Sequence, residues 1–100
     1  LPIHLPEVRL EVEPVFHLFV VQLYDPQGLL EYLREESIHA GVHYPLPVHL
    51  QPAYQDRIQT ASDMSTTESL VKKIISLPIY PELSINDTNK IVNTLKKFFN

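Results

Sequence analysis

The chain has 100 residues, the size of one domain, with no room for a second core. Its formal charge is −4 and its eight basic residues are scattered, so a nucleic-acid partner is not expected. The absence of cysteine excludes a disulfide scaffold and a thiolate metal site, and no apolar run is long enough to span a membrane. We therefore expect a cytoplasmic protein without a membrane partner. Because the chain begins with Leu1 rather than methionine, we also expect it to be part of something longer.

The first part of the chain is predicted to be extended. Residues 1–14 contain three prolines, which prevent a long helix and leave an extended lead-in with a short edge strand near Val8–Val12. The run from Val15 to Leu23 is β-branched and aromatic, which is typical of a central strand buried on both faces. We expect His17, inside this run, to be a core imidazole with its hydrogen bonds satisfied.

A helix should follow. Asp25 and Pro26 form a strong start signal, an N-cap carboxylate followed by proline at the first helical position. The helix should end near Ser37, and its apolar face should carry Leu29, Leu30 and Leu33. A second strand is then predicted from His39 to Tyr44, where two prolines force an extended loop.

Two more helices and a short strand complete the chain. Ser65–Glu68 matches a capping box, and apolar residues at helical spacing continue to Ile75. Ile75–Ile79 has room for a short strand, and Ser84 with Asp87 should open a last amphipathic helix. The order of elements predicts an α+β fold, a small and mainly antiparallel sheet covered by helices on one face, as a single domain over residues 1–100.

The segment Gly41–Tyr54 is the most informative for function. Its prolines hold an extended path at low entropic cost, and it is rich in hydrogen-bonding side chains: His43, Tyr44, His49, Gln51 and Tyr54. Such groups on a stiff loop suit recognition of hydroxyls, phosphates or a sugar ring. On residue types alone, the commoner role is to satisfy backbone groups within the loop, and that alternative stays open.

A metal site formed by His39, His43 and His49 is a further hypothesis. His39 and His43 are four residues apart, but on a strand that spacing separates them by about 13 Å. No acidic residue lies in the segment with His49 to complete a ligand set. We therefore expect no metal.

The segment is similar to a signature of the DegT/DnrJ/StrS family of sugar aminotransferases, whose C-terminal domains carry a Gly-Val/Ile-x-His-Tyr-Pro-x-Pro-x-His-x-Gln-x-x-Tyr-like run. Three other stretches resemble the family in the same order: Phe16–Val20, Leu29–Ile38 and Ser76–Leu83. With them, the resemblance covers residues 14 to 99. The stretch Gln55–Thr66 departs from the family, because it lacks the glycine and proline of a "G-x-x-P-x-x-E" segment, which leaves the course of that loop open.

The resemblance implies the small C-terminal domain of a fold-type-I aminotransferase. In this family a large N-terminal domain holds pyridoxal phosphate (PLP) on a lysine, the substrate is a nucleotide-linked keto-sugar, and an amino acid donates the amino group. Carried over by position, His43 and Tyr44 are the substrate contacts, with His49 and Gln51 as further contacts. The parent protein is implied to be a homodimer, and the "His-Tyr-Pro-x-Pro-x-His" version is most similar to members that aminate 3-keto hexoses.

The cofactor is expected outside this chain. The five lysines, Lys72, Lys73, Lys90, Lys96 and Lys97, lie on predicted polar helix faces, where a hydrated ammonium is a poor nucleophile. We therefore assign no catalytic and no cofactor-binding residue here, and expect the isolated chain to be inactive, with PLP bound by the missing large domain. The alternative is a non-catalytic, stand-alone module that binds a sugar nucleotide or a protein.

Overall fold

The computed structural model describes residues 1–100 and contains one three-stranded antiparallel sheet and three α-helices, the α+β arrangement that the sequence predicts. In chain order the elements are β1 (Ile3–His4), β2 (Phe19–Leu23), α1 (Pro26–Glu35), a 3₁₀ turn (Val48–Leu50), α2 (Ser65–Leu70), β3 (Ile74–Leu77) and α3 (Ile85–Phe98). The strand order in the sheet is β1-β2-β3. No helix combines the length and apolar character needed to cross a bilayer.

The two faces of the sheet differ. β2 is the central strand, as predicted, and it pairs Val21 with Ile75 and Val20 with Ser76 of β3. Val21 and Ile75 are fully buried and face the core. Gln22, the next residue of β2, is exposed on the opposite face. The prediction that this strand is buried on both faces is therefore wrong, because the helices cover only one face.

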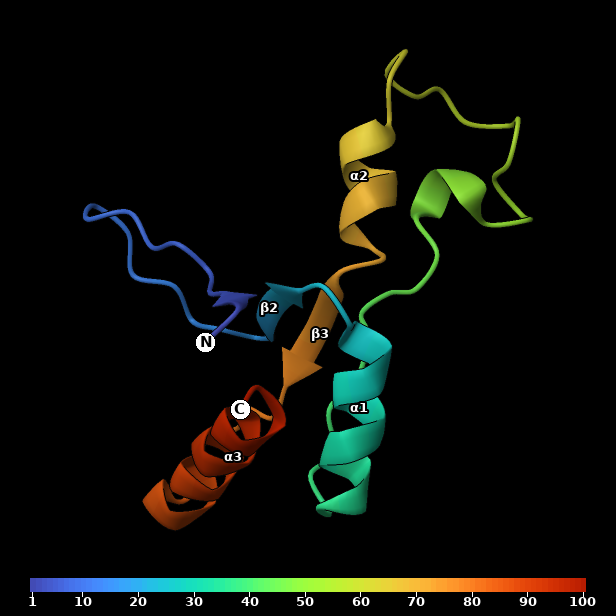
Figure 1. Ribbon diagram of the computed structural model, residues 1–100. Helices are drawn as coiled ribbons and strands as arrows, with labels where there is room; N and C mark the ends of the chain where they lie inside the picture. Colours follow the sequence, from blue (N-terminus) through green and yellow to red (C-terminus); the bar gives the residue numbers. More distant parts are fainter.

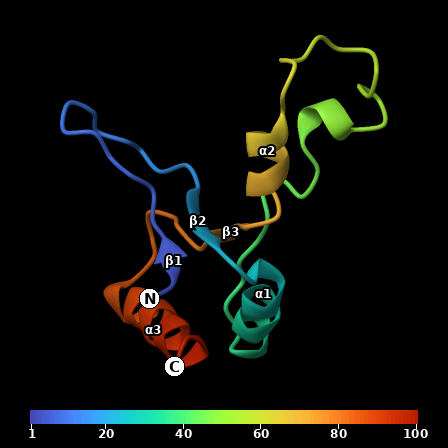
Figure 2. The same ribbon diagram turned by 45° about the horizontal axis from the view of Figure 1, so that its top comes forward.

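The helices α1 and α3 form the covering layer. Figures 1 and 2 show both on the same side of the β2–β3 pair, whereas α2 and the loop before it project away from the sheet. α1 meets α3 through Tyr32 and Phe98, whose ring centroids lie 5.4 Å apart. The enclosed core is small, with eight buried apolar side chains: Val21, Leu23, Leu29, Leu33, Ile38, Ile75, Ile91 and Leu95.

The ends of α1 and α3 follow the sequence signals. The Asp25 carboxylate accepts a hydrogen bond of 2.9 Å from the backbone N–H of Gly28, with proline at the first helical position. α1 closes with the Ile38 N–H donating to the Leu33 carbonyl and with Ser37 at φ 60°, a left-handed cap in which a glycine is the usual residue. Ser84 caps α3 by accepting from the N–H of Asp87.

The N-terminal prediction fails in two places. The edge strand is Ile3–His4 rather than Val8–Val12, and residues 5–18 form an arm that leaves the sheet and returns (Figure 1). β2 starts only at Phe19, because Phe16 has a φ of 48°, which interrupts an extended backbone. His17 consequently lies in the arm, where it is exposed, and it is not the core imidazole that the sequence predicts.

Two further elements are shorter than predicted. The strand expected over His39–Tyr44 is reduced to a single bridge between Gly41 and Ser76. α2 ends at Leu70, because Ile75 enters the sheet opposite Val21 instead of extending the helix. The helical spacing in this segment therefore misled the prediction.

The capping box predicted at Ser65–Glu68 is also not formed. The N-cap is Met64, without a side-chain cap bond, and the Asp63 carboxylate accepts from the Ser65 N–H at 2.8 Å. Hydrogen bonds from the Ser65 hydroxyl and from this N–H hold the pKa of the Asp63 carboxyl below its usual value. Glu68 is turned elsewhere, toward the loop before α2.

Candidate functional site

His43 lies over the sheet face that the helices leave uncovered. Its Nδ1 is 2.9 Å from the Oγ of Ser76 on β3, and Gly41 lies directly beside the ring. The two backbone hydrogen bonds between Gly41 and Ser76, at 3.0 and 2.7 Å, hold this part of the loop against the strand. Ser76 shares the face of Val20, its partner in β2. The imidazole is exposed, although one nitrogen is fixed to the sheet.

Tyr44 lies beside His43 and points outward. Its ring meets the imidazole edge-on, with centroids 5.3 Å apart and an interplanar angle of 79°. The peptide bond that joins the two residues is cis. Tyr44 is 69% exposed, so its phenol is available to a ligand. The structure thus brings together an imidazole and a phenol from the loop and the hydroxyl of Ser76.

His49 and Gln51 have partners inside the loop region instead. The Nε2 of His49 is 2.9 Å from the Oε1 of Glu68, and the His49 side chain is only 10% exposed. The side-chain amide of Gln51 donates to the carbonyl of Leu46 at 3.1 Å. These two side chains hold the loop together, which is the role that residue types alone favour for such a segment.

The two partner residues were missed at the sequence level. The sequence predicts Glu68 to be a capping-box residue, whereas its carboxylate pairs with His49, 19 positions earlier. Ser76 interrupts the apolar run of β3. Because strand side chains alternate between the two faces, Ser76 lies on the face that points away from the core. That interruption is the signal that could have pointed to it.

His49→Ala is expected to raise backbone hydrogen exchange in residues 47–57 and in α2 by about tenfold, or about 1.4 kcal/mol. The substitution removes the side-chain hydrogen bond that joins the loop to α2, in a lobe that projects from the sheet (Figure 2). Gln27→Ala is the matched control, since it removes a side-chain bond of 2.8 Å to Glu31 on α1. Unchanged exchange in the loop of the His49 variant would contradict the assignment.

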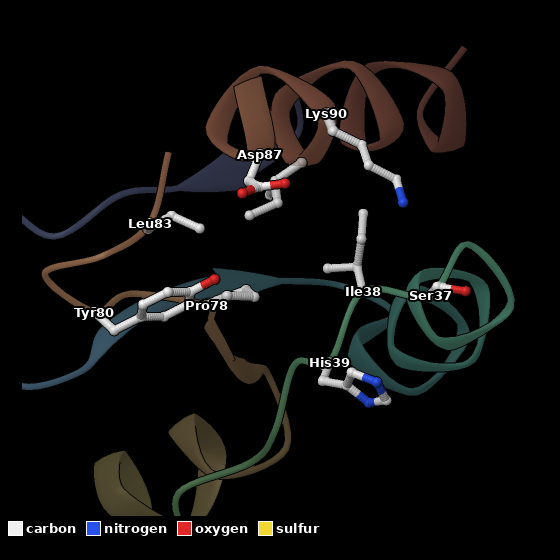
Figure 3. Close-up of a pocket in the computed structure, with 9 residues that line it drawn as sticks. Ser37, Ile38, His39, Pro78, Tyr80, Leu83, Asp87 and Lys90 are labelled. Atoms are coloured by element: carbon white, nitrogen blue, oxygen red, sulfur yellow. The ribbon is translucent and has the colours of Figure 1, made fainter. Parts of the chain in front are cut away.

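A hollow lies between α3 and the segment that follows α1, away from the His43–Tyr44 pair. Figure 3 shows Asp87 and Lys90 of α3 on one side and Tyr80 on the other, with His39 at the rim. Its volume is about 220 Å³, below the roughly 300–1,000 Å³ usual for small-molecule sites. None of the four predicted contact residues lines it.

The donor groups do not assemble into a metal site or a PLP site. No group of three His, Cys, Asp or Glu residues is placed to hold a metal ion. The histidines considered for zinc diverge, since His43 binds Ser76 and His49 binds Glu68. All five lysines are exposed on the surface, including Lys90 at the small hollow, so none is enclosed as a lysine that holds PLP would be. The residues of this chain therefore do not fit PLP.

Comparison with known proteins identifies the class. A sequence model of the DegT/DnrJ/EryC1/StrS aminotransferase family matches residues 2–96, and the chain belongs to this family. The chain is 34% identical over 96 residues to the dTDP-3-amino-3,6-dideoxy-alpha-D-galactopyranose transaminase of Aneurinibacillus thermoaerophilus, covering 96% of this chain and 26% of that protein. It is 36% identical over 94 residues to the erythromycin biosynthesis sensory transduction protein EryC1 of Saccharopolyspora erythraea, with coverage of 94% and 26%.

Solved structures agree on the fold. A DegT DnrJ EryC1 StrS aminotransferase from Brucella abortus superimposes with a TM-score of 0.91 at 29% identity, over 97% of this chain and 26% of that one. NtdA from Bacillus subtilis, crystallised with bound cofactor PMP, gives a TM-score of 0.80 at 27% identity, with coverage of 96% and 22%. The chain thus spans about a quarter of the length of the relatives it matches.

Proposed function

We propose that this chain is the C-terminal small domain of a PLP-dependent aminotransferase that transfers an amino group from an amino acid to a nucleotide-linked keto-sugar. Family membership supports the reaction class, and the name of the Aneurinibacillus relative supports a sugar aminated at carbon 3. The PMP bound by NtdA supports the cofactor. PLP supplies the amine chemistry in such enzymes, and in this proposal it is held outside the 100 residues.

The role of this domain is to contact the sugar nucleotide. The observation that carries the proposal is the exposed His43–Tyr44 pair, fixed by Ser76 to the open face of the sheet. Two neighbouring groups that can donate and accept hydrogen bonds suit the hydroxyl and phosphate oxygens of such a substrate. His49 and Gln51 stabilise the loop that presents the pair. In this proposal they affect substrate binding only by maintaining the conformation of the loop.

Because PLP is held outside these 100 residues in the proposal, the 100-residue chain should be inactive alone. Incubated with PLP, an amino-acid donor and a dTDP-linked 3-keto hexose, it should show neither the visible absorbance of protein-bound PLP nor amino-sugar formation, because its lysines are hydrated. The full-length protein that contains it should show both. Turnover by the 100 residues alone would refute the proposal.

A binding measurement separates the rival function. A stand-alone binding module should bind a dTDP-sugar by calorimetry as the 100-residue chain, without any other domain. The proposal expects no measurable binding in that case, because one pair of hydrogen-bonding side chains on an open face cannot offset the entropic cost of association.

A further inference from the structure

We propose that Ser76 is a positioning residue, which orients the imidazole of His43 so that its Nε2 faces the substrate. The inference rests on the proposed function, since it takes His43 to be a substrate contact. It adds a residue that lies within the sheet rather than in the loop and that contacts no ligand itself.

The anchor is rigid. Ser76 is 5% exposed, and its backbone N–H and carbonyl are both bonded to Gly41. It lies in the middle of β3, opposite Val20 of the central strand. Its Oγ therefore has little freedom to move, and the 2.9 Å contact fixes the position of Nδ1 of His43 relative to the sheet.

The ring is held from two other sides. A Cβ at Gly41 would lie 3.3 Å from Cε1 of the imidazole, so the ring rests close against the glycine backbone. Tyr44 meets the ring edge-on from the outside. An exposed histidine normally loses rotamer freedom when it binds a ligand, and this loss opposes binding. Here the contacts with Ser76, Gly41 and Tyr44 remove much of that freedom before binding.

The serine also determines which nitrogen is available. Nδ1 is occupied by Ser76, so Nε2 is the free nitrogen of the imidazole. A hydroxyl can either accept from Nδ1–H or donate to a bare Nδ1, so Ser76 supports either neutral tautomer. Nε2 can accordingly accept a hydrogen bond from a sugar hydroxyl or donate one to a phosphate oxygen.

The packing of the sheet does not require this hydroxyl. The core face of β3 is formed by Ile75, whereas Ser76 lies on the face without helices. An alanine or cysteine at this position keeps the strand pairing, because the β3 pairing with β2 and Gly41 uses backbone groups. The side-chain oxygen has His43 as its hydrogen-bond partner in the chain.

The test uses the full-length enzyme loaded with PLP. Ser76→Ala is expected to raise the KM for a dTDP-linked keto-sugar about threefold to tenfold, with kcat, the KM for the amino donor and PLP content unchanged. Ser76→Cys, which fills nearly the same volume with a weakly bonding thiol, should behave alike and covers the case in which the alanine variant folds poorly. Thr94→Val is the matched control, since it removes another hydroxyl that is 5% exposed, on α3.

Two comparisons decide the outcome. In the Ser76→Ala, His43→Ala double variant, the KM should equal that of His43→Ala alone, because the serine acts only through the histidine. If His43→Ala raises KM while Ser76→Ala and Ser76→Cys do not, the positioning role is wrong and the proposed function stands. If His43→Ala leaves KM unchanged, the substrate contact is wrong and the positioning role falls with it.

The ring nitrogens offer a readout independent of turnover. In the ¹⁵N NMR spectrum of the 100-residue chain, the Nδ1 and Nε2 shifts of His43 should change between wild type and Ser76→Cys, while those of His4 should not. Gly41→Ala, whose new methyl must displace the ring, should move the same resonances with Ser76 intact. Identical His43 shifts in all three proteins would overturn the anchoring.

Discussion

Ile75→Ala is expected to lower the free energy of unfolding by about 3 kcal/mol. The side chain is fully buried at the centre of the sheet, opposite Val21, which is also fully buried. Removing it leaves a cavity between the sheet and the helices, in a core of only eight apolar side chains. Since natural domains are stable by about 5–15 kcal/mol, a loss of this size removes roughly a fifth to three fifths of the stability.

Urea denaturation followed by circular dichroism measures the effect. Val92→Ala is the matched control, because Val92 is 39% exposed on α3, and its loss should be below about 1 kcal/mol. A loss of less than about 1 kcal/mol in the Ile75 variant would show that the sheet and helices do not form one core.

The sequence predicts the helices better than the strands, and the reason is the range of the signals. Asp25, Pro26 and Ser84 act on backbone groups within a few positions, so the starts of α1 and α3 can be located without knowing the rest of the structure. The end of α1 is similarly local, since the cap at Ser37 uses carbonyls of the last turn.

The strands depend on pairing between distant residues. Val15–Leu18 has the composition of a strand, but the φ of 48° at Phe16 interrupts the extended backbone, and only the part from Phe19 pairs with β3. Leu70–Ile75 has helical spacing, yet Ile75 gains more by burial opposite Val21 than by extending α2. Such competition between local preference and tertiary packing is not visible in one sequence.

The hydrogen-bond partners of the candidate site residues could not be predicted for the same reason. Residue types and spacing pointed to His43 and Tyr44, which the structure places together and exposed. The resemblance also indicates His49 and Gln51, in second place, and in the structure these two side chains form hydrogen bonds within the loop region. Burial distinguishes the two sets, since the His49 side chain is 10% exposed whereas Tyr44 is 69% exposed.

His43→Ala in the full-length enzyme is expected to reduce kcat/KM for the keto-sugar nucleotide about tenfold to a hundredfold, or about 1.4–2.8 kcal/mol. The substitution removes a hydrogen bond to a polar or charged substrate group, and such bonds contribute about 1.5–3 kcal/mol when the partner is charged. Steady-state kinetics with varied sugar nucleotide, at saturating amino donor, measures the loss. The visible absorbance of bound PLP should be unchanged, because the residue lies in a domain that does not fit the cofactor.

His39→Ala is the most useful control for this result. His39 is also exposed and lies only four residues earlier, but it lines the hollow beside Tyr80 and Asp87 instead of the open sheet face. If His43 is the substrate contact, the decrease in kcat/KM caused by His43→Ala should be at least tenfold larger than the decrease caused by His39→Ala. A larger decrease in kcat/KM in the His39 variant would indicate that the substrate binds at the hollow beside α3. An equal loss of PLP in the His43 variant would instead make this residue part of the scaffold, since substrate recognition and cofactor retention would then fail together.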